Sequence, residues 1–563
     1  MSYPVVVAID FGTTYSGFAY AHIARPADIT SHDSWPGQNK TRFKAPKNNT
    51  VLQYDNSYDK VIAWGYQALA REPRRRRNNA VEPVSKPVEY FKLLLKYDSK
   101  RSDKIRMPAG LDYRKAIADY LKAMKPLISE TITKRWPTVS FPNQVRLVFT
   151  VPAEWGPGTI GVLQECIYAA GYLENENSNN NLEFITEPEA VALYCMDKLN
   201  EHLLKEGSTF MVVDCGGGTV DLTTRKLATS DTLSEVSERT GDFCGSTYVD
   251  DEFITFLKNE LGSKAMSDFK ENHYDEYQYL IHHFFCPEIK FGFDGDSFDA
   301  TDLDIGRFCP ALKDYITKDI SDKLRKEDWL LEITYEDVLA MFDPVINRII
   351  RLIRNQLTAS KEKCSALFLA GGFSESPYLI SKIKNAFGST VSIISVPQNP
   401  ISAVVRGGVI YGLNTKAIAT RQLTLNYEWV TGDPLEKKTE DDHIFKFDCL
   451  AKRGVEYSPT QDFSSTYSPV YPDQKGMNFQ IYATPRNNQK FCDEPGMGLI
   501  GELFIELPDV KYQLDRPVEF SLMFGELLIT ATAWCKKSGK ACKATFEYAR
   551  PEAYEVKNRS WFI

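Results

Sequence analysis

Two segments far apart in the chain share one plan, and this repeat constrains the fold more than any other feature. Val5–Ile9 is an apolar, mostly β-branched run that ends at Asp10, and a glycine turn with threonines then leads into a second apolar run. Phe210–Val213 ends at Asp214 in the same way, before another glycine turn, a threonine and a returning run. Apolar runs joined by a short Gly-containing turn are typical of a β-hairpin. We therefore expect two related half-domains, each containing one such hairpin.

The composition of the two turns suits a phosphate. Glycines lack a Cβ and reach positive φ, so their backbone N–H groups can approach a charged oxygen closely. Each such contact contributes roughly 1.5–3 kcal/mol, and several together hold a polyphosphate. Asp10 and Asp214 would repel phosphate, but they can hold water on Mg²⁺, which prefers carboxylates and retained waters. Facing each other across a cleft, the hairpins would hold the β- and γ-phosphates; the alternative is two tight hairpins without a ligand.

A third segment joins an apolar strand to a helix through a glycine pair. The strand Ala366–Ala370 runs into Gly371 and Gly372. Ser376 is well placed to cap a helix whose first residue is Pro377. The glycine pair can lie flat beside a nucleoside, and the alternative is a plain strand-to-helix turn.

In this order, the three segments resemble the two phosphate motifs and the adenosine motif of the seventy-kilodalton heat-shock (DnaK-type) family. Thr186–Ala192 resembles its first connecting motif, and Asn399–Gly412 resembles the second. Val148–Ala153 resembles the strand before the first connector, and the match spans residue 4 to about residue 415. Three short sequences resemble the divergent class-twelve branch and its fungal relatives: Gly-Gly-Phe-Ser-Glu-Ser in the third segment, Gly-Ser-Thr at the turn 245–247 and Arg-Gly-Gly in the second connector.

The resemblance implies an α/β fold of the actin-like ATPase kind. Residues 1–417 would form a nucleotide-binding domain of two ribonuclease-H-like lobes that close over Mg-ATP, with ATP or ADP and Mg²⁺ as cofactors. Residues 418–563 would form a reduced, β-rich C-terminal domain. The nucleotide contacts that it implies are Gly12, Thr13, Thr14, Tyr15, Gly216, Gly217, Gly218, Thr219, Gly245, Lys290, Gly371, Gly372 and Phe373.

The resemblance also implies catalytic residues. Asp10 and Asp214 would act through magnesium-bound water, and Glu187 would position the metal or the attacking water. The family places a catalytic lysine in the first lobe, for which Lys92 is the candidate, although a lysine on an amphipathic helix is more often solvated. Asp221 is a further candidate for a supporting role.

The chain departs from the family at the nucleoside end. Glu375 stands where an arginine usually stacks on the base, and Phe291 stands near the position of a second arginine. Phe291 could stack on adenine, or it could be a core residue. Ile401 replaces an acidic residue of the second connector, and Cys244–Thr247 replaces a Gly-Gly-Glu-Asp turn. The two phosphate motifs keep the family's residues, so we expect the ligand to be ATP. The departures at the nucleoside end leave the selectivity for the base open.

The C-terminal region changes character after about residue 418. Two stretches, Glu436–Asp442 and Tyr457–Tyr471, are predicted to be loops. The predicted strands are Glu502–Leu507, Val518–Phe524, Leu527–Cys535 and Lys543–Tyr548, the last two joined by a hairpin turn over Lys536–Lys540. Few residues follow, so the family's helical lid is expected to be absent. Gly496–Gly501 fits the dinucleotide spelling G-x-G-x-x-G, but no buried strand precedes it and no helix follows, so we reject it.

Composition limits the partners and the location. The net charge of -8 argues against nucleic-acid binding, because a duplex favours a basic surface. Arg74–Arg77 is most simply a solvated loop, and otherwise a nuclear signal or an anion patch. No signal peptide and no membrane span are expected. The eleven cysteines include no C-x-x-C pair, which suits reduced thiols and a cytoplasmic or nuclear location.

Three functions are compatible with these motifs. The first is slow ATP hydrolysis that drives lobe closure and changes affinity for a protein client or cochaperone. The second is a nucleotide-binding regulatory or interaction module of the same fold without turnover. The third is a small-molecule kinase, for which no catalytic aspartate motif is found, so it ranks last.

Overall fold

In the computed structural model, the chain forms two compact units. The residues that it describes are 3–38, 45–69, 85–95, 107–153, 155–174, 181–201, 204–229, 232–423, 425–431, 436–439, 442–444, 448–487, 489, 491, 494, 496–524, 529–539 and 541–546. Unit 1 comprises Met1–Glu154, Glu165–Thr223 and Thr240–Thr415, and unit 2 comprises Trp155–Gln164, Thr224–Arg239 and Lys416–Ile563. The basic run 74–77 and the residues after 546, which bear on the helical lid, lie outside the described part.

The first sheet of unit 1 is built on the N-terminal hairpin. Its strands are β1 (Val5–Asp10), β2 (Tyr15–His22), β3 (Thr30–Ser31), β8 (Val145–Val151) and β9 (Leu182–Thr186), in the order β3-β2-β1-β8-β9, and β4 (Asn48–Asn49) also pairs with β2. β1 is antiparallel to β2 and parallel to β8. Every residue of β1 is buried, as expected for a central strand covered on both faces.

The second sheet repeats this strand order. Its strands are β10 (Thr209–Cys215), β11 (Val220–Thr229), β12 (Thr232–Asp242), β15 (Cys364–Ala370) and β16 (Ile393–Ser395), in the order β12-β11-β10-β15-β16. β10 is buried along its whole length and pairs in parallel with β15. Both predicted hairpins are therefore confirmed, and each lies at the same place in its own sheet.

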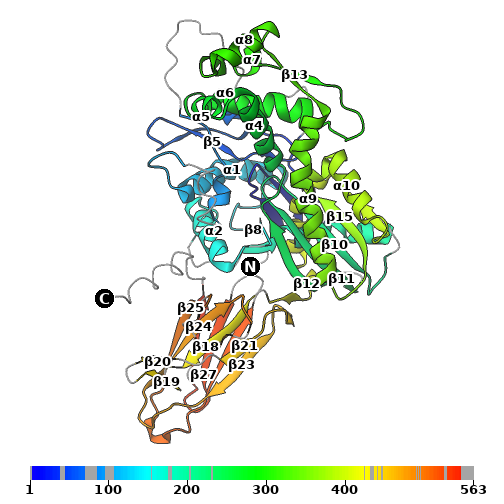
Figure 1. The fold of residues 1–563 in the computed structure, drawn as a ribbon. Coiled ribbons are helices and arrows are strands. Elements are labelled where there is room, and N and C mark those ends of the chain that lie inside the picture. Colours follow the sequence, from blue (N-terminus) through cyan, green and yellow to red (C-terminus); the bar gives the residue numbers. More distant parts are fainter. Residues whose placement is uncertain are drawn as a thin grey trace. The chain divides into compact units, whose positions relative to one another are not determined.

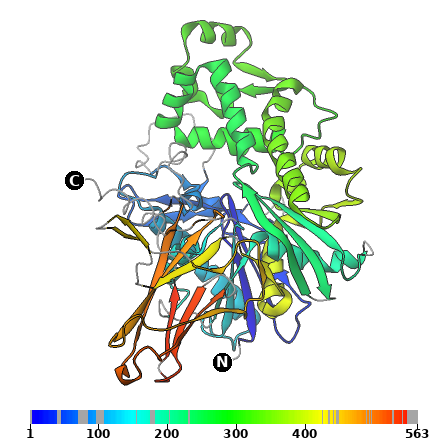
Figure 2. The same ribbon diagram turned by 60° about the horizontal axis from the view of Figure 1, so that its bottom comes forward.

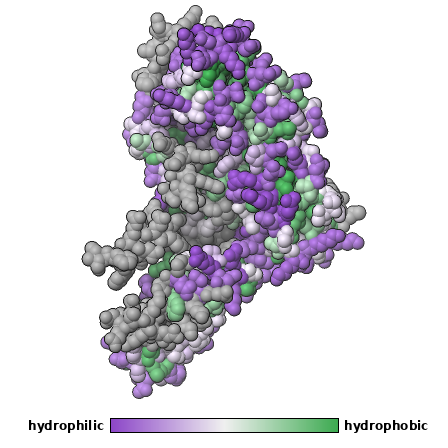
Figure 3. All heavy atoms as spheres, viewed as in Figure 1, coloured by the Kyte–Doolittle hydropathy of each residue, from purple (hydrophilic) through white to green (hydrophobic). Residues whose placement is uncertain are grey.

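Helices cover the sheets and extend beyond the second one. The helices are α1 (Tyr113–Arg135), α2 (Pro157–Ala169), α3 (Glu187–Glu201), α4 (Thr247–Leu261), α5 (Ser263–Asn272), α6 (Tyr274–Leu280), the π-helix η4 (Ile281–Lys290), α7 (Ile305–Phe308), α8 (Lys318–Lys326), α9 (Tyr335–Ala359), α10 (Pro377–Phe387) and α11 (Ala403–Leu413). Figure 1 shows α9 and α10 beside β10 and β15. The surface over α7 and α8 is mostly hydrophilic (Figure 3).

Short elements complete unit 1. They are the sheet β6-β5-β7 (Val61–Trp64, Val51–Tyr54, Val88–Glu89), the pair β13 (Thr301–Asp304) and β14 (Leu330–Ile333), and the 3₁₀-helices η1 (Gly65–Ala68), η2 (Phe91–Leu95), η5 (Pro310–Asp314), η6 (Gly372–Glu375) and η7 (Pro400–Ser402). The 3₁₀-helix η8 (Thr415–Ala417) spans the sequence boundary between the two units. Among the described helices, none combines the length and the apolar character needed to cross a membrane.

Local sequence explains where the main helices begin and how they pack. α9 begins with a capping box in which the Thr334 side chain accepts from the backbone of Asp337 and the Asp337 side chain accepts from the backbone of Thr334, which satisfies two free N–H groups. Ser376 caps α10 by accepting from the backbone N–H of Leu379, and Pro377 is its first residue, as predicted. α3 and α11 approach closely because position 407 is glycine: a Cβ there would lie 1.7 Å from the carbonyl oxygen of Ala190.

Unit 2 contains a sandwich of two antiparallel sheets (Figure 2). One has the order β21-β18-β24-β25 (Asp448–Ala451, Asn426–Thr431, Gly476–Thr484, Gly498–Glu506), and the other β23-β26-β27-β28 (Asp462–Tyr467, Val518–Phe524, Ile529–Cys535, Ala541–Phe546). Buried and less buried residues alternate along β26. Phe479 of the first sheet stacks on Phe520 of the second with ring centroids 4.6 Å apart. β17 (Arg421–Gln422) pairs with β22 (Glu456–Tyr457), and η9 spans Val510–Tyr512.

Two loop predictions in this unit are wrong. The stretch Tyr457–Tyr471 contains β23, and Glu436–Asp442 contains β19 (Glu436–Thr439), which pairs with β20 (Asp442–Ile444). β23 lies at the edge of its sheet and none of its side chains is buried. Its sequence has only two apolar residues, Phe463 and Tyr467, which are too few to reveal a strand by apolar alternation. The four predicted strands correspond to β25, β26, β27 and β28 over their described residues, while residues 527, 528, 547 and 548 of the predicted ranges lie outside the described part. The glycine spelling at 496–501 runs into β25 without a helix.

A buried arginine organises one end of the sandwich. Arg516 has no exposed surface. Its guanidinium donates hydrogen bonds to backbone carbonyl oxygens of Gln513, Gln474, Leu507 and Pro472 at 2.6–3.1 Å. Because a planar guanidinium has five donors in a fixed fork, this one side chain ties together the connections before β24 and after β25.

Candidate functional site

The turns of the two hairpins lie in contact. A Cβ on Gly217 would lie 2.1 Å from Thr14 Oγ1, and a Cβ on Gly218 would lie 2.9 Å from Thr13 Oγ1. Only a residue without a side chain allows so close an approach, so glycine at 217 is required by the opposite turn. The two segments with one plan therefore meet at one place, although they belong to different sheets.

The glycine pair of the third segment lies against the second aspartate. Gly371 has φ +82°, and a Cβ there would lie 2.5 Å from Asp214 Oδ1 and 2.3 Å from the carbonyl oxygen of Cys215. Gly372 faces open space, since no atom lies within 4 Å of the position of its Cβ. Phe373 is buried in the hydrophobic core that packs around the second sheet. The strand-to-helix turn is thus brought to the same place as the two hairpin turns.

Asp10 is paired with a lysine that sequence analysis did not single out. Lys47 Nζ lies 2.5 Å from Asp10 Oδ2, and the ion pair is almost fully buried. The other carboxylate oxygen of Asp10 accepts a hydrogen bond from Thr150 Oγ1 at 3.3 Å. No motif surrounds Lys47 in the sequence, and only the pairing of β4 with β2 places it here.

Glu187 and Lys92 form a second buried ion pair. Lys92 Nζ donates to Glu187 Oε1 at 2.8 Å. Lys92 lies on η2 and is only 4% exposed, in contrast to the solvated lysine that its sequence context suggested. Its ammonium also lies 5.9 Å from the centroid of the Phe11 ring, which lies in the first hairpin turn. Glu187 is the first residue of α3.

Asp214 has a carboxylate oxygen that nothing in the described structure satisfies. Its Oδ1 is buried and has no hydrogen-bond partner. Burial, followed by the nearby charges of Glu187 and Asp10, raises the pKa of Asp214 to about 8 against the opposing effect of Lys47 and Lys92. Burial and the proximity of Asp10 likewise raise the pKa of Glu187. Although burial opposes its charge, the carboxylate of Asp10 raises the pKa of Lys47, and Asp214 and Glu187 contribute to that effect.

These five side chains form one cluster of three carboxylates and two ammonium groups, which we call the charge cluster: Asp10, Asp214, Glu187, Lys47 and Lys92. Buried charges are costly unless they are paired or meet a ligand. The two ion pairs leave Asp214 as the carboxylate without a salt-bridge partner among the described residues.

The cluster fits a nucleotide better than it fits a metal held by protein ligands alone. Glycine turns bearing threonine hydroxyls border it, which is the chemistry of a phosphate cradle. Among the described residues, no group of three metal-ligating side chains is present. Asp214 Oδ1, which lacks a partner among the described residues, could hold a water of a magnesium ion, whereas both oxygens of Asp10 already have partners, Thr150 and Lys47.

The remaining predicted contacts lie in varied surroundings. Gly245 lies against the second turn, since a Cβ there would lie 2.4 Å from the carbonyl oxygen of Gly217. Tyr15 is 37% exposed. Lys290 is buried and pairs with Asp250 at 2.7 Å. The supporting candidate Asp221 accepts a hydrogen bond from the backbone N–H of Ala153 at 3.1 Å, so it holds the end of β8.

The predicted nucleoside end of the site has fewer converging residues than the predicted phosphate end. Phe291 is 60% exposed, so it is not a core residue and its face is accessible. Glu375 is exposed at the surface, and partial desolvation raises the pKa of its carboxyl group. These two residues stand where the family resemblance leads us to expect arginines, and neither supplies a positive charge.

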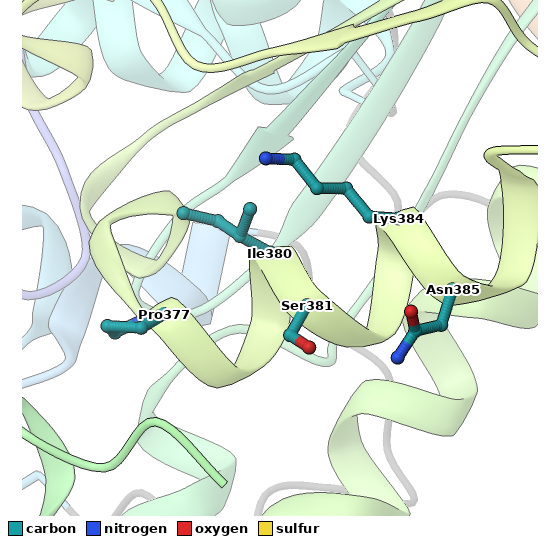
Figure 4. Close-up of a pocket in the computed structure, with 5 residues that line it drawn as sticks. All are labelled: Pro377, Ile380, Ser381, Lys384 and Asn385. Atoms are coloured by element: carbon teal, nitrogen blue, oxygen red, sulfur yellow. The ribbon is translucent and has the colours of Figure 1, made fainter. Parts of the chain in front are cut away.

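A hollow on the outer side of α10 is separate from the charge cluster. It has a volume of about 360 Å³ and is lined by Pro377, Ile380, Ser381, Lys384 and Asn385. Figure 4 shows that all five side chains come from one helix and that Lys384 and Ile380 project on a different side from Ser381 and Asn385. A hollow with one helix as its wall lacks the converging groups of a binding site.

The fold and the site together define the class of the protein: a mixed α/β chain with paired glycine turns at the ends of two like sheets, followed by a β-sandwich. No protein-family model matches the chain. It is similar to heat shock 70 kDa protein 12A of Homo sapiens (25% identical over 97% of this chain and 92% of that protein) and of Mus musculus (26%, 97% and 91%). Heat shock 70 kDa protein 12B of Homo sapiens is 24% identical, over 97% of this chain and 91% of that protein. The chain thus matches the divergent class-twelve branch of the seventy-kilodalton heat-shock family, and the resemblance drawn from the motifs is confirmed.

Proposed function

We propose that the chain binds ATP or ADP at the charge cluster and hydrolyses ATP slowly. The observation that carries the proposal is the meeting of three glycine turns near Asp214, whose buried Oδ1 has no partner among the described residues. Relatives named as heat-shock proteins and the two sheets of like strand order support an actin-like, two-lobed nucleotide-binding domain over residues 1–417. Residues 418–563 then form the reduced β-rich domain.

The glycine turns and three residues of the charge cluster have roles in this proposal. The N–H groups and hydroxyls of the turns, from Gly12 to Tyr15 and from Gly216 to Thr219, bind the phosphates. Asp214 orients water near the γ-phosphate, and Glu187, held by Lys92, positions the attacking water. When bound, Mg²⁺ supplies positive charge that offsets the charge of the phosphates. Positioning and electrostatics of this kind carry most of phosphoryl-transfer catalysis.

Binding requires the turns to move. Gly217 and Thr14 are in contact, so a polyphosphate can enter between the hairpins only if they separate. This supports a coupling between the nucleotide and the movement of the two halves, by which affinity for a protein client or cochaperone would change. We place this activity in the cytoplasm, with the nucleus as the alternative.

Two measurements test the proposal. Titration with ATP should give binding at micromolar concentrations, and phosphate should be released with Mg-ATP at a rate above that of Asp214→Ala. Release no faster than in that variant would reject hydrolysis. Tight binding without release would favour the second candidate, a nucleotide-binding module without turnover, which the altered nucleoside end supports. Absence of binding would reject both.

A further inference from the structure

Lys47 is held at the charge cluster by its own supporting contacts. It directly precedes β4, whose residues Asn48 and Asn49 pair with the second strand of the first hairpin. The backbone N–H of Thr50 donates to the carbonyl oxygen of Thr14 at 2.8 Å, which ties the segment to the phosphate turn itself. The ammonium group is thus positioned by the same hairpin that supplies the predicted phosphate contacts.

A glycine makes room for the lysine. A Cβ on Gly17 would lie 2.9 Å from the carbonyl oxygen of Pro46 and 3.0 Å from Cγ of Lys47. Tyr66 donates its hydroxyl to the carbonyl oxygen of Lys47 at 3.3 Å. The stem of Lys47 therefore runs through packed structure to Asp10, and the side chain is only 13% exposed.

The position of this ammonium bears on how phosphate charge is offset. A polyphosphate brings several negative charges to a site that already holds three carboxylates. A buried lysine is a permanent part of the site, whereas a divalent cation can dissociate from it. The interaction of its charge with a phosphate is strong because the dielectric constant of a buried site is low. Lys47 Nζ forms an ion pair with Asp10 Oδ2, so it occupies a position at which this oxygen could accept a hydrogen bond from a metal-bound water.

We infer that Lys47 acts as a built-in cation for the phosphates, so that the chain binds nucleoside polyphosphates without a divalent metal. The inference rests on the proposed nucleotide site and defines its ligand as the metal-free nucleotide as well as the magnesium complex. The competing possibility is that the Lys47–Asp10 pair is structural and that nucleotide still requires magnesium.

Calorimetric titration of the full chain with ATP, in excess EDTA and in excess Mg²⁺, tests the inference without any substitution. We expect dissociation constants that differ by less than about tenfold, equivalent to 1.4 kcal/mol. Binding that appears only with Mg²⁺ would overturn the inference and leave the proposed function intact. Binding in neither condition would overturn the proposed function itself.

Variants then assign the effect to the residue. Lys47→Met should weaken ATP binding in EDTA at least tenfold more than binding in Mg²⁺, and Lys122→Met, on the exposed side of α1, should match the wild type. Because Lys47→Met leaves Asp10 buried without its cation, Lys47→Met combined with Asp10→Asn removes both charges. Far-ultraviolet circular dichroism identifies the variants that fold. A folded single or double variant that binds ATP in EDTA like the wild type would overturn the inference.

Discussion

Lys92 and Glu187 form a buried ion pair, 2.8 Å long, between the 3₁₀-helix η2 and the first turn of α3. The two residues are 95 positions apart in the sequence. Their side chains are 4% and 11% exposed, so each is the partner that allows the other to remain charged inside the protein. This pair holds the proposed water-positioning carboxylate in place.

Removing one partner of this pair should cost more than removing both charges. Lys92→Met leaves a buried carboxylate unpaired, and we expect the free energy of unfolding to fall by about 3–5 kcal/mol. The double variant Lys92→Met with Glu187→Gln should recover most of that loss but should still fail to release phosphate. Urea unfolding and a phosphate-release assay measure the two effects. A single variant as stable as the wild type would show that the pair is not buried in solution.

The glycine pair at 371 and 372 offers a matched test of the site's packing. Gly371→Ala would place a methyl group 2.5 Å from Asp214 Oδ1 at a positive φ, and we expect a loss of stability of about 1–3 kcal/mol. Gly372→Ala has open space around it and should change the urea midpoint little. Equal effects of the two substitutions would contradict the approach of Gly371 to the second aspartate.

The raised pKa of Asp214 predicts a pH dependence of stability. Its pKa is about 8 in the folded chain, because of burial and the nearby charges of Glu187 and Asp10, against an ordinary value of 3.8. Between these values the folded chain binds the extra proton, so its stability should fall as pH rises from about 4 to 8, by up to about 1.4 kcal/mol per pH unit. Asp214→Asn should flatten this slope. Urea unfolding without nucleotide at pH 5, 6, 7 and 8 measures it, and parallel slopes in both proteins would refute the assignment.

Arg516 should be replaceable by neither a cation nor an apolar residue. Its guanidinium donates hydrogen bonds to carbonyl oxygens of the segment before β24 and of the segment after β25. A lysine has three donors at one point and lacks the planar fork. We expect both Arg516→Lys and Arg516→Met to lower the free energy of unfolding, by about 1–3 kcal/mol for each carbonyl left unsatisfied. A wild-type urea midpoint for Arg516→Lys would show that charge alone is enough.

Much of the local structure could be predicted from the sequence. The hairpins at Asp10 and Asp214, the serine cap at Ser376 and the described part of the turn, 536–539, depend on neighbouring residues, whose turn chemistry and apolar periodicity are local. β23 was missed because this edge strand has no buried side chain and carries only two apolar residues, Phe463 and Tyr467, among serine, threonine and aspartate. The resemblance suggested Lys92, yet the solvated surroundings that its context implied are replaced by a buried ion pair.

The sequence by itself determined the paired strand–aspartate–glycine plan and, through the ordered motifs, the heat-shock resemblance. The tertiary structure alone decided that Lys47 reaches Asp10 and that Lys92 reaches Glu187. It also decided that one oxygen of Asp214 meets no partner in the part of the chain that the structure describes. The physical reason is that turn geometry is set within a few residues, whereas the partner of a buried charge is set by strand crossovers that bring distant segments together. Residues 37 and 95 positions apart become neighbours only when the sheets and their connections have formed.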